Sequence, residues 1–476
     1  MAISERIFSF EDQEKFAQLS GDCNPMHMDA LAARRTQAGA PVVHGMHLLL
    51  WSLNSVLRQH PEMNGIQKIR AQFQKFVLVG EQAAAEVVSI KGNTVRWVVS
   101  VDGGIRCKFV AHFTTDTQEL LDSEVSHAPD EGMESPTSAL ELSLADLTNR
   151  TGSLRIPSAA AEGMARIYPA AAAGMGARRM ASLALSSTLV GMVCPGLHSI
   201  YGELTVNAAP LDQSPIPLRY RVTETDARFR TVSMEIDGGG WTGNVEAFLR
   251  TPPVLQPSMD ELRGRFAADQ FQGVRALIVG GSRGLGELTA KLLATGGAET
   301  WITYRSGKAD AENVAGEIVA AGGVCHPVQW DATEPAEKLL AQLGEVPTQV
   351  YYFATPTIFR PQARTYEPER LQSFLQVYVD GFWRLVESLR RINPEVRLYY
   401  PSSISVSDRP QGMTEYSMAK AAGEVLCADI NEQLAPTRVV MTRLPRLATD
   451  QTASVTAVET VPAVDVMTEV ICAMHA

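Results

Sequence analysis

The first half of the chain contains an internal repeat, which constrains the fold more than any other feature of the sequence. Residues 64–69 have a counterpart at 195–200, with a glycine at the second position of each segment. The offset is 196 − 65 = 131, and the same offset places Gly45 on Gly176. Several matches that occur in the same order and at nearly the same offset indicate two copies of one structural unit.

Each copy is predicted to contain an apolar helix followed by strands. The helices lie at 45–57 and 180–192. Alternating apolar and polar residues predict strands at 68–77, 81–90 and 94–101, and in the second copy around 205 and at 218–223 and 231–236. A later match, 101–104 against 236–239, has an offset of 135 and predicts a four-residue insertion. One helix followed by an antiparallel meander predicts a sheet wrapped around a helix.

Composition limits the class of protein. The 476 residues correspond to roughly three domains at ~150 residues each, and a formal charge of −11 argues against a nucleic-acid partner. Six widely spaced cysteines without a CxxC pair predict neither a disulfide framework nor a metal site. We expect a cytoplasmic protein, because the N-terminus has no apolar segment typical of a signal peptide. Polar residues interrupt the apolar stretch 180–200, so we expect no membrane span.

Two segments are predicted to be linkers. Residues 122–141 are rich in serine, glutamate, proline and aspartate and have no periodicity, and 251–259 contain three prolines. The predicted domains are therefore 1–120, 147–253 and 272–476.

Two side chains capable of proton transfer lie close together near the N-terminus. Asp22 and His27 are separated by a turn at Asn24-Pro25, so both can converge on one water molecule, which Asn24 could orient. Gly45 opens the apolar helix, where its N–H can point at a developing oxyanion. In the alternative interpretation, Asp22 and Asn24 only cap a turn and His27 is an ordinary surface residue.

This region, over 8–113, resembles the MaoC-like, (R)-specific enoyl-CoA hydratases of the hotdog fold. The resemblance rests on LSGDCNPMHMD at 19–29 and VVHGM at 42–46. It implies that Asp22 and His27 are catalytic, that Asn24 supports them and that Gly45 is the oxyanion donor. It also implies an acyl thioester substrate, either hydrated as a 2-enoyl compound or dehydrated as an (R)-3-hydroxyacyl compound.

The second copy is predicted to be catalytically empty. The constant offset pairs Asp22 with Ser153, Asn24 with Arg155 and His27 with Ser158. The resemblance then implies a double hotdog with one hydratase site per chain, in which the second half supplies scaffold and space for the acyl chain.

The last third of the sequence predicts a doubly wound parallel sheet. An apolar strand at 274–279 enters a glycine-rich turn at 280–286, and a helix continues to about residue 295. Further strands are predicted at 299–304, 324–330, 349–353, 396–400 and 438–443, and further helices at 309–321, 335–343, 368–391 and 416–433. This alternation is typical of α/β folds of the Rossmann type.

The second predicted strand of this region ends at Arg305, where a dinucleotide's 2′ substituent would lie. An acidic residue at this position would favour NAD, whereas arginine favours the 2′-phosphate of NADP. Arg283 adds a second positive charge nearby. We therefore predict NADP as the cofactor.

A second group of reactive side chains follows. Tyr416 and Lys420 are i and i+4 on one predicted helix, so a nearby ammonium can lower the pKa of the phenol. Ser403 lies 13 residues before Tyr416 and can hydrogen-bond a substrate oxygen.

Over 272–449 the chain resembles the short-chain dehydrogenase/reductases, especially 3-ketoacyl thioester reductases. The resemblance implies a catalytic Ser403, Tyr416 and Lys420, and a homodimer formed through this region. It also implies cofactor contacts at Gly280, Ser282, Arg283, Gly284, Gly286, Arg305 and Asp331.

The sequence departs from that family at four places. Phe353-Ala354-Thr355-Pro356 stands where the family has Asn-Asn-Ala-Gly, and Tyr378 where it often has a catalytic asparagine. Pro445-Arg446 replaces a Pro-Gly pair, and only 27 residues follow Thr449. The usual substrate lid and last strand are therefore expected to be short or missing.

Three functions fit these patterns. The first is a bifunctional 3-ketoacyl thioester reductase and 3-hydroxyacyl thioester dehydratase, because both sites handle the same hydroxyacyl compound. The second is a dehydratase whose reductase-like domain only binds nucleotide. The third is a non-enzymatic scaffold in lipid or polyketide assembly. The acyl carrier, either coenzyme A or a carrier protein, stays open.

Overall fold

The computed structural model describes residues 2–114, 132–156, 158–210, 217–356, 358, 365–447, 449 and 460–476. Two compact units are present, and the boundary between them falls at Pro252 and Pro253, inside the predicted linker 251–259. None of the helices in the described ranges has both the length and the apolar character needed to cross a bilayer.

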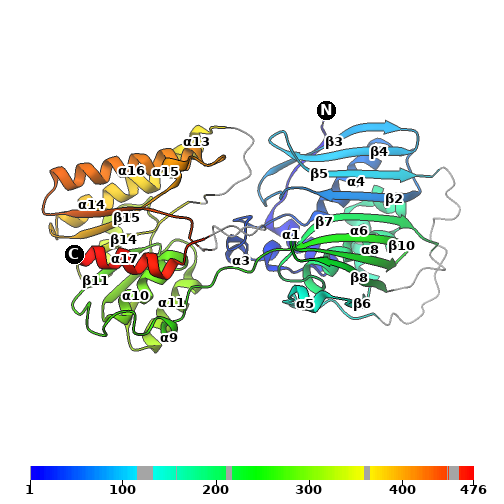
Figure 1. Cartoon of the computed structure of the whole chain (residues 1–476). Coiled ribbons are helices and arrows are strands. Elements are labelled where there is room, and N and C mark those ends of the chain that lie inside the picture. The colour runs from blue at the N-terminus through cyan, green and yellow to red at the C-terminus, as the bar shows by residue number, and fades with distance from the viewer. Residues whose placement is uncertain are drawn as a thin grey trace. The chain divides into compact units, whose positions relative to one another are not determined.

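The N-terminal unit contains one antiparallel sheet of ten strands (Figure 1). Its order is β1-β3-β4-β5-β2-β7-β10-β9-β8-β6, so the two copies repeat the same order outward from the central β2–β7 pair. The first copy supplies β1 (Ala2–Ile7), β2 (Ile66–Phe73), β3 (Gln82–Lys91), β4 (Thr94–Val101) and β5 (Gly104–Phe113). The second supplies β6 (Thr151–Leu154), β7 (Ser199–Ala208), β8 (Leu218–Asp226), β9 (Thr231–Gly238) and β10 (Trp241–Leu249). The sequence pattern did not predict β1, β5, β6 or β10.

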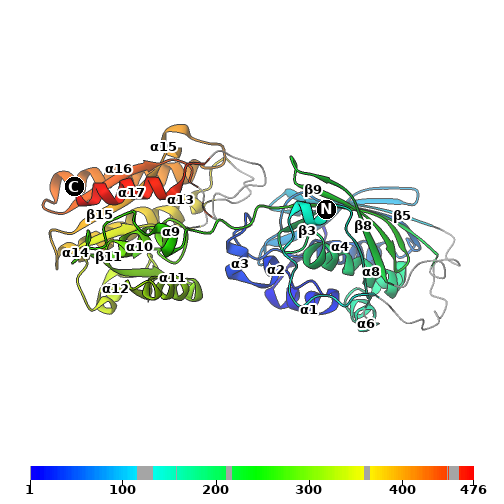
Figure 2. The same ribbon diagram turned by 60° about the horizontal axis from the view of Figure 1, so that its bottom comes forward.

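Each copy places one long helix against this sheet (Figure 2). The first is α4 (Gly45–Gln59), and the second is α8 (Ala177–Thr188), which continues into the π-helical turn η1 (Leu189–Val193). Both helices are almost fully buried and share one hydrophobic core with the inner face of the sheet. Burial explains why α4 is apolar around most of its circumference, whereas α8 also buries the polar side chains of Arg179, Ser182, Ser186, Ser187 and Thr188.

The structure corrects the register of the repeat. The β4–β5 hairpin turns at Asp102-Gly103, and the β9–β10 hairpin turns at Gly239-Gly240. The structural offset is therefore 239 − 102 = 137, two residues more than the sequence match. The β8–β9 connection (residues 227–230) is longer than the β3–β4 connection (92–93) and accounts for this extra length.

A larger difference lies before the central helices. In the first copy, α1 (Phe10–Ser20) and α4 are joined by residues 21–44, whereas in the second copy α6 (Ser158–Ile167) and α8 are joined by residues 168–176. The gapless pairings of Asp22 with Ser153, Asn24 with Arg155 and His27 with Ser158 are therefore wrong. Ser153 lies on β6, before α6, whereas Asp22 follows α1. The segment that corresponds to the Asp22 loop is 168–176, which contains no acidic residue and no histidine.

Part of the first predicted linker packs against the second copy. The Leu140 N–H donates a hydrogen bond to the Met192 carbonyl oxygen, and the Leu197 N–H donates one to the Leu140 carbonyl oxygen, both at 2.8 Å. Met133 forms a bridge with Leu154. The rest of that prediction, 122–131, lies outside the described residues.

The C-terminal unit contains a six-stranded parallel sheet of order β13-β12-β11-β14-β15-β16. The strands are β11 (Arg275–Val279), β12 (Glu299–Tyr304), β13 (Val324–Gln329), β14 (Gln349–Tyr352), β15 (Arg397–Ser403) and β16 (Arg438–Leu444). The main helices are α10 (Gly284–Thr295), α11 (Lys308–Ala320), α12 (Ala336–Leu343), α13 (Pro368–Leu375), α14 (Phe382–Arg390), α16 (Thr414–Gln433) and α17 (Ala463–His475).

Two features of this unit bear on its site. The helix predicted at 368–391 is divided by a π-helical turn, η2 (Gln376–Gly381), between α13 and α14. Within the described part of the chain, β16 is the edge of the sheet and α17 is the last element.

Candidate active sites

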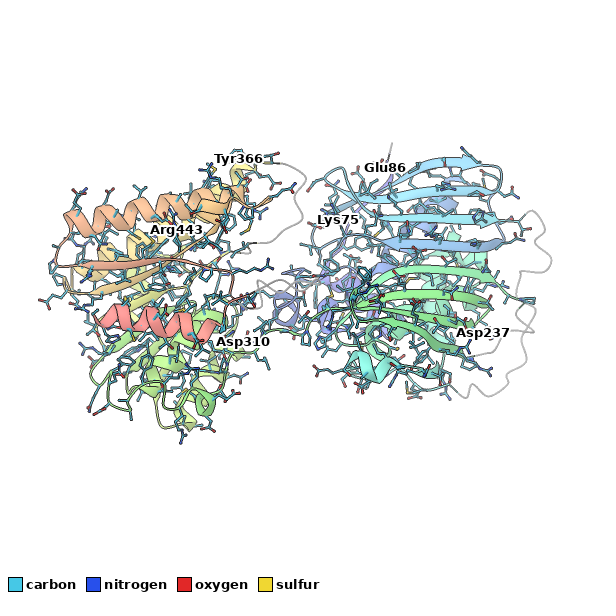
Figure 3. The ribbon with its side chains drawn as sticks, viewed as in Figure 1. Lys75, Glu86, Asp237, Asp310, Tyr366 and Arg443 are labelled. Atoms are coloured by element: carbon cyan, nitrogen blue, oxygen red, sulfur yellow. The ribbon has the colours of Figure 1, made fainter. Side chains whose placement is uncertain are left out.

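The first candidate site lies on the segment that joins α1 to α4. Gly21 ends α1 in the left-handed conformation, with φ 84°. The Asn24 side chain then accepts a hydrogen bond from the Met26 N–H and so caps the short helix α2 (Pro25–Met28). These local turns place Asp22 and His27 beside one cavity of about 60 Å³, which Gly45 also lines. Lys75, labelled in Figure 3, lines the same cavity.

Asp22 is buried, and the second copy supplies a partner for its carboxylate. The Ser187 hydroxyl on α8 donates a hydrogen bond of 2.6 Å to Asp22 Oδ2, and the Asn24 N–H donates one of 3.2 Å to Oδ1. Burial raises the pKa of Asp22, while the charge of His27 and these two hydrogen bonds oppose that rise. The site therefore contains a carboxyl group whose proton affinity is increased.

The histidine is oriented by the backbone. Its Nδ1 lies 2.7 Å from the Val42 carbonyl oxygen, so Nδ1 is the donor and Nε2 is left to exchange a proton with substrate or water. Its ring stacks on His44 at a centroid distance of 3.9 Å. Burial holds the pKa of His44 well below its usual range, so the stacked neighbour is uncharged.

In the described part of the chain, one group of side chains could hold a metal ion: Asp22, His27 and His44, whose ligand atoms all lie within 4.8 Å of one another. Both ring nitrogens of His44 already face oxygen atoms, at 2.9 Å from Gln13 Oε1 and 3.0 Å from the Asp22 carbonyl. His44 therefore fits a structural role better than that of a ligand.

The Asn24 side chain makes hydrogen bonds at both its oxygen and its nitrogen. Its side-chain oxygen caps α2, and its amide nitrogen donates to the Gly191 carbonyl oxygen at 2.6 Å. The amide therefore ties the Asp22 loop to η1 of the second copy, and its role in orienting water stays a prediction.

Gly45 lies where the sequence placed it, at the first turn of α4. A Cβ at this position would lie 2.9 Å from the Phe73 ring, so a larger residue would displace the cavity wall. The backbone at the start of α4 is thus close enough to the cavity to stabilise a negative oxygen.

Sequence reasoning missed two residues of this site, Ser187 and His44. Ser186, Ser187 and Thr188 are three consecutive polar residues within the helix predicted at 180–192, which is a usable signal because buried hydroxyl groups need partners. His44 was visible within VVHGM, but nothing in the sequence shows that it stacks on His27.

The second candidate site begins at the glycine-rich turn between β11 and α10. Gly280 has φ 82°, and a Cβ on Gly286 would lie 2.2 Å from the Gly280 carbonyl oxygen. Ser282 is buried in the turn, Arg283 is the N-cap of α10, and Gly284 begins that helix. The turn therefore brings backbone N–H groups to a helix N-terminus, as a bound pyrophosphate requires.

Arg305 and Asp331 follow β12 and β13 at the same edge of the sheet. Arg305 Nε lies 3.8 Å from Asp331 Oδ2, and the Arg305 side chain is 69% exposed. The Asp331 carboxylate also accepts hydrogen bonds from the N–H and the hydroxyl of Thr333. The arginine is held beside the turn while its guanidinium stays accessible to a ligand.

Ser403, Tyr416 and Lys420 line one cavity of about 520 Å³. Lys420 Nζ donates to the Pro401 carbonyl oxygen at 2.7 Å, and burial lowers the pKa of Lys420 to about 7. Burial raises the pKa of Tyr416, and a hydrogen bond with Ser403 opposes this. A hydroxyl, a phenol and an amine thus face one space large enough for a small carbonyl compound.

The departures from the family pattern lie in the same cavity. Thr355, Tyr378 and Arg446 all line it. The hydroxyls of Thr355 and Tyr378 form a short hydrogen bond, and the Tyr378 ring is buried. Tyr378 lies on η2, the π-helical turn that the sequence did not predict.

Comparison with protein families identifies both regions. A MaoC-like domain model matches residues 4–106, and a short chain dehydrogenase model matches residues 275–460. The chain joins a MaoC-like domain to a short-chain dehydrogenase domain. The MaoC-like domain has the hotdog fold, and the dehydrogenase domain has the Rossmann-like fold.

The similar curated proteins are oxidoreductases. An uncharacterized oxidoreductase of Mycobacterium bovis is 27% identical over 191 residues, covering 37% of this chain and 55% of the relative. L-rhamnose 1-dehydrogenase (NADP(+)) of Thermoplasma acidophilum is 37% identical over 82 residues, covering 16% and 32%. The chain thus spans about half the length of the mycobacterial relative and about a third of the Thermoplasma relative.

Among solved structures, a short chain dehydrogenase of Burkholderia cenocepacia in complex with NADP is 23% identical. It covers 43% of this chain and 91% of its own, with a TM-score of 0.40.

Proposed function

We propose that this protein is a bifunctional enzyme that reduces a 3-ketoacyl thioester and then dehydrates the (R)-3-hydroxyacyl product to a 2-enoyl thioester. The observation that carries the proposal is that one chain contains two separate sets of reactive groups for consecutive steps. Asp22 and His27 share one cavity, and Ser403, Tyr416 and Lys420 share another. The hydroxyacyl thioester is the product of one step and the substrate of the other.

At the first site, the geometry suits addition or removal of water. His27 Nε2 and the Asp22 carboxyl group can exchange protons with the substrate's α-carbon and its 3-hydroxyl group, so that water leaves as the double bond forms. The N–H groups at the start of α4 stabilise the thioester oxygen as negative charge develops. Two hotdog halves complete this site, because Ser187 and Gly191 come from the second half.

At the second site, Tyr416 donates its proton to the 3-keto oxygen, and Ser403 hydrogen-bonds the same oxygen. A charged Lys420 lowers the pKa of the Tyr416 phenol and so favours this proton transfer. When bound, a reduced nicotinamide supplies the hydride that completes the reduction.

NADP is the cofactor that this chain's residues favour. Close packing at Gly286 fits the strand–turn–helix cradle of a dinucleotide, and Arg305 offers an accessible positive charge where a 2′-phosphate would lie. The Thermoplasma relative is also named as an NADP(+) enzyme. We expect Arg305→Ala to raise KM for NADPH about tenfold and to leave KM for NADH unchanged.

A second candidate function is a hydratase whose dehydrogenase domain binds nucleotide without turnover. Phe353, Ala354 and Tyr378 favour it, because they line the cavity at positions where the family has asparagine residues.

The test is a coupled assay with NADPH and a short 3-ketoacyl thioester, analysed by absorbance and product mass. We expect NADPH oxidation and a product lighter by one water than the hydroxyacyl compound. Asp22→Asn should stop the reaction at the hydroxyacyl product, and Tyr416→Phe should abolish oxidation. Tight NADPH binding without oxidation, alongside intact hydratase activity, would favour the second candidate. Full loss of hydratase activity in Asp22→Asn would rule out a scaffold that only assembles other proteins.

A further inference from the structure

The surroundings of Lys420 are unusual for a buried amine. Lys420 is 5% exposed. Among the described residues, its ammonium donates a hydrogen bond to the Pro401 carbonyl oxygen. Three tyrosine rings surround the ammonium, with Nζ lying 3.9 Å from the ring centroid of Tyr378, 5.0 Å from Tyr400 and 5.9 Å from Tyr416. The Tyr378 ring is the nearest, at a distance where a cation–π interaction is strong.

The charged form of Lys420 depends on these rings. The titratable groups that face it are the three tyrosines and Cys427, all of which have raised pKa values because they are buried. These groups are uncharged at neutral pH, so none of them offsets the positive charge by ion pairing. Ring faces and one carbonyl oxygen are left to stabilise the ammonium against the cost of burial.

Tyr378 itself is held firmly in place. Its ring stacks on Phe374 with an interplanar angle of 4°, and its hydroxyl hydrogen-bonds Thr355. Its ring also packs edge-on against Tyr416, at 5.8 Å between centroids. A single rigid ring therefore contacts both the amine and the phenol of the proposed reductase site.

We propose that Tyr378 is a positioning residue of the reductase site, whose ring face holds the Lys420 ammonium beside Tyr416. This inference rests on the proposed reductase function for its catalytic meaning, but its physical content concerns Lys420 alone. Removing the ring destabilises the ammonium, and the phenol then loses the positive charge that favours proton transfer. The Tyr378 hydroxyl is not needed for this role, because the ammonium faces the ring.

The test separates the ring from the hydroxyl. Protein labelled with [¹³Cε]lysine is titrated by NMR without substrate or cofactor, and Lys420→Arg assigns the Lys420 resonance. We expect the same Lys420 pKa in the wild type, about 7, and in Tyr378→Phe. In Tyr378→Leu we expect a pKa lower by about one unit, as the loss of a buried cation–π contact predicts. An unchanged pKa in Tyr378→Leu, or an equal drop in Tyr378→Phe, would overturn the proposal.

A second substitution covers the case in which Tyr378→Leu fails to fold. Trifluorophenylalanine at position 378 keeps the shape of the ring and weakens the negative potential of its face, so the Lys420 pKa should fall below that of Tyr378→Phe. Equal values in these two variants would overturn the proposal.

Activity adds an independent readout. At neutral pH we expect kcat for ketone reduction to drop about tenfold in Tyr378→Leu and less than twofold in Tyr378→Phe. If no variant and no wild-type protein reduces a ketone while the NMR shift appears, the reductase function fails and the role of Tyr378 in holding Lys420 stands.

Discussion

The two copies in the N-terminal unit share a sheet order and a central helix, but they differ in the segment before that helix. The first copy has residues 21–44 there, with Asp22 and His27, and the second has only residues 168–176. The second copy nevertheless takes part in the site, because Ser187 and Gly191 contact the Asp22 carboxylate and the Asn24 amide. The comparison shows how a duplicated fold can divide one cavity, with the proposed acid–base pair in one copy and its hydrogen-bond partners in the other.

The largest expected effect tests whether the acid–base pair belongs to the first copy alone. Asp22→Asn should lower kcat/KM for hydration of a 2-enoyl thioester about a thousandfold, because the amide cannot exchange the proton. Ketone reduction should be unchanged. Asp29→Asn is the matched control, since Asp29 caps the nearby helix α3 (Ala30–Arg34) and asparagine caps equally well. A loss below tenfold in Asp22→Asn would show that another group carries the chemistry.

The next effect tests the contact between η1 and the carboxylate. A Cβ on Gly191 would lie 2.5 Å from Asp22 Oδ1, so Gly191→Ala must push the carboxylate aside. We expect about a hundredfold loss in hydration, because displacements near 1 Å have effects of this size. Gly316→Ala in α11 is the control, since nothing lies within 4 Å of the added methyl group. Wild-type hydration by Gly191→Ala would refute a supporting role for η1.

A smaller effect is expected from the hydrogen bond of the second copy. Ser187→Ala should lower hydration about tenfold, as for loss of a hydrogen bond to a charged group. It should also move the acid limb of the pH profile upward. The reason is that burial already raises the pKa of Asp22, the Ser187 hydroxyl opposes that rise, and the active carboxylate is lost as pH falls through this pKa. Ser182→Ala, also on α8, is the control, because the Ser182 hydroxyl donates to the Gly238 carbonyl oxygen and Ser182 does not line the cavity. An unmoved acid limb would count against this contact.

The smallest expected effect concerns Ser153, the residue that the constant offset pairs with Asp22. Ser153 lies on β6 and takes no part in the cavity. Ser153→Ala should therefore leave hydration within twofold of the wild type in a steady-state assay. A larger loss would mean that β6 also contributes to the site.

The sequence predicted some parts of the molecule well because the relevant physics is local. Parallel strands buried on both faces give continuous apolar runs, so β11 (Arg275–Val279) lies within one residue of its predicted bounds, 274–279. Gly284 begins a helix, as the glycine-rich turn requires. Asp22 and His27 lie five residues apart, and one short turn brings them to the same cavity.

Other features depend on contacts that are distant in sequence. The Ser187–Asp22 hydrogen bond joins residues 165 positions apart, and no spacing rule could give it. The alignment of the two copies failed because short glycine motifs mark the turns but give no sign that the second copy has a shorter segment, 168–176, before its central helix. The π-helical turn that carries Tyr378 was missed because its residues continue a helical pattern on both sides.

A double-mutant cycle tests most directly whether both copies form one hydratase site. Hydration of a 2-enoyl thioester is measured for the wild type, Asp22→Asn, Ser187→Ala and the combined variant, with Ser182→Ala as control. If Ser187 acts through the Asp22 carboxylate, the combined variant should be no slower than Asp22→Asn alone. Losses that multiply would contradict the account, because they would show that Ser187 acts independently of Asp22.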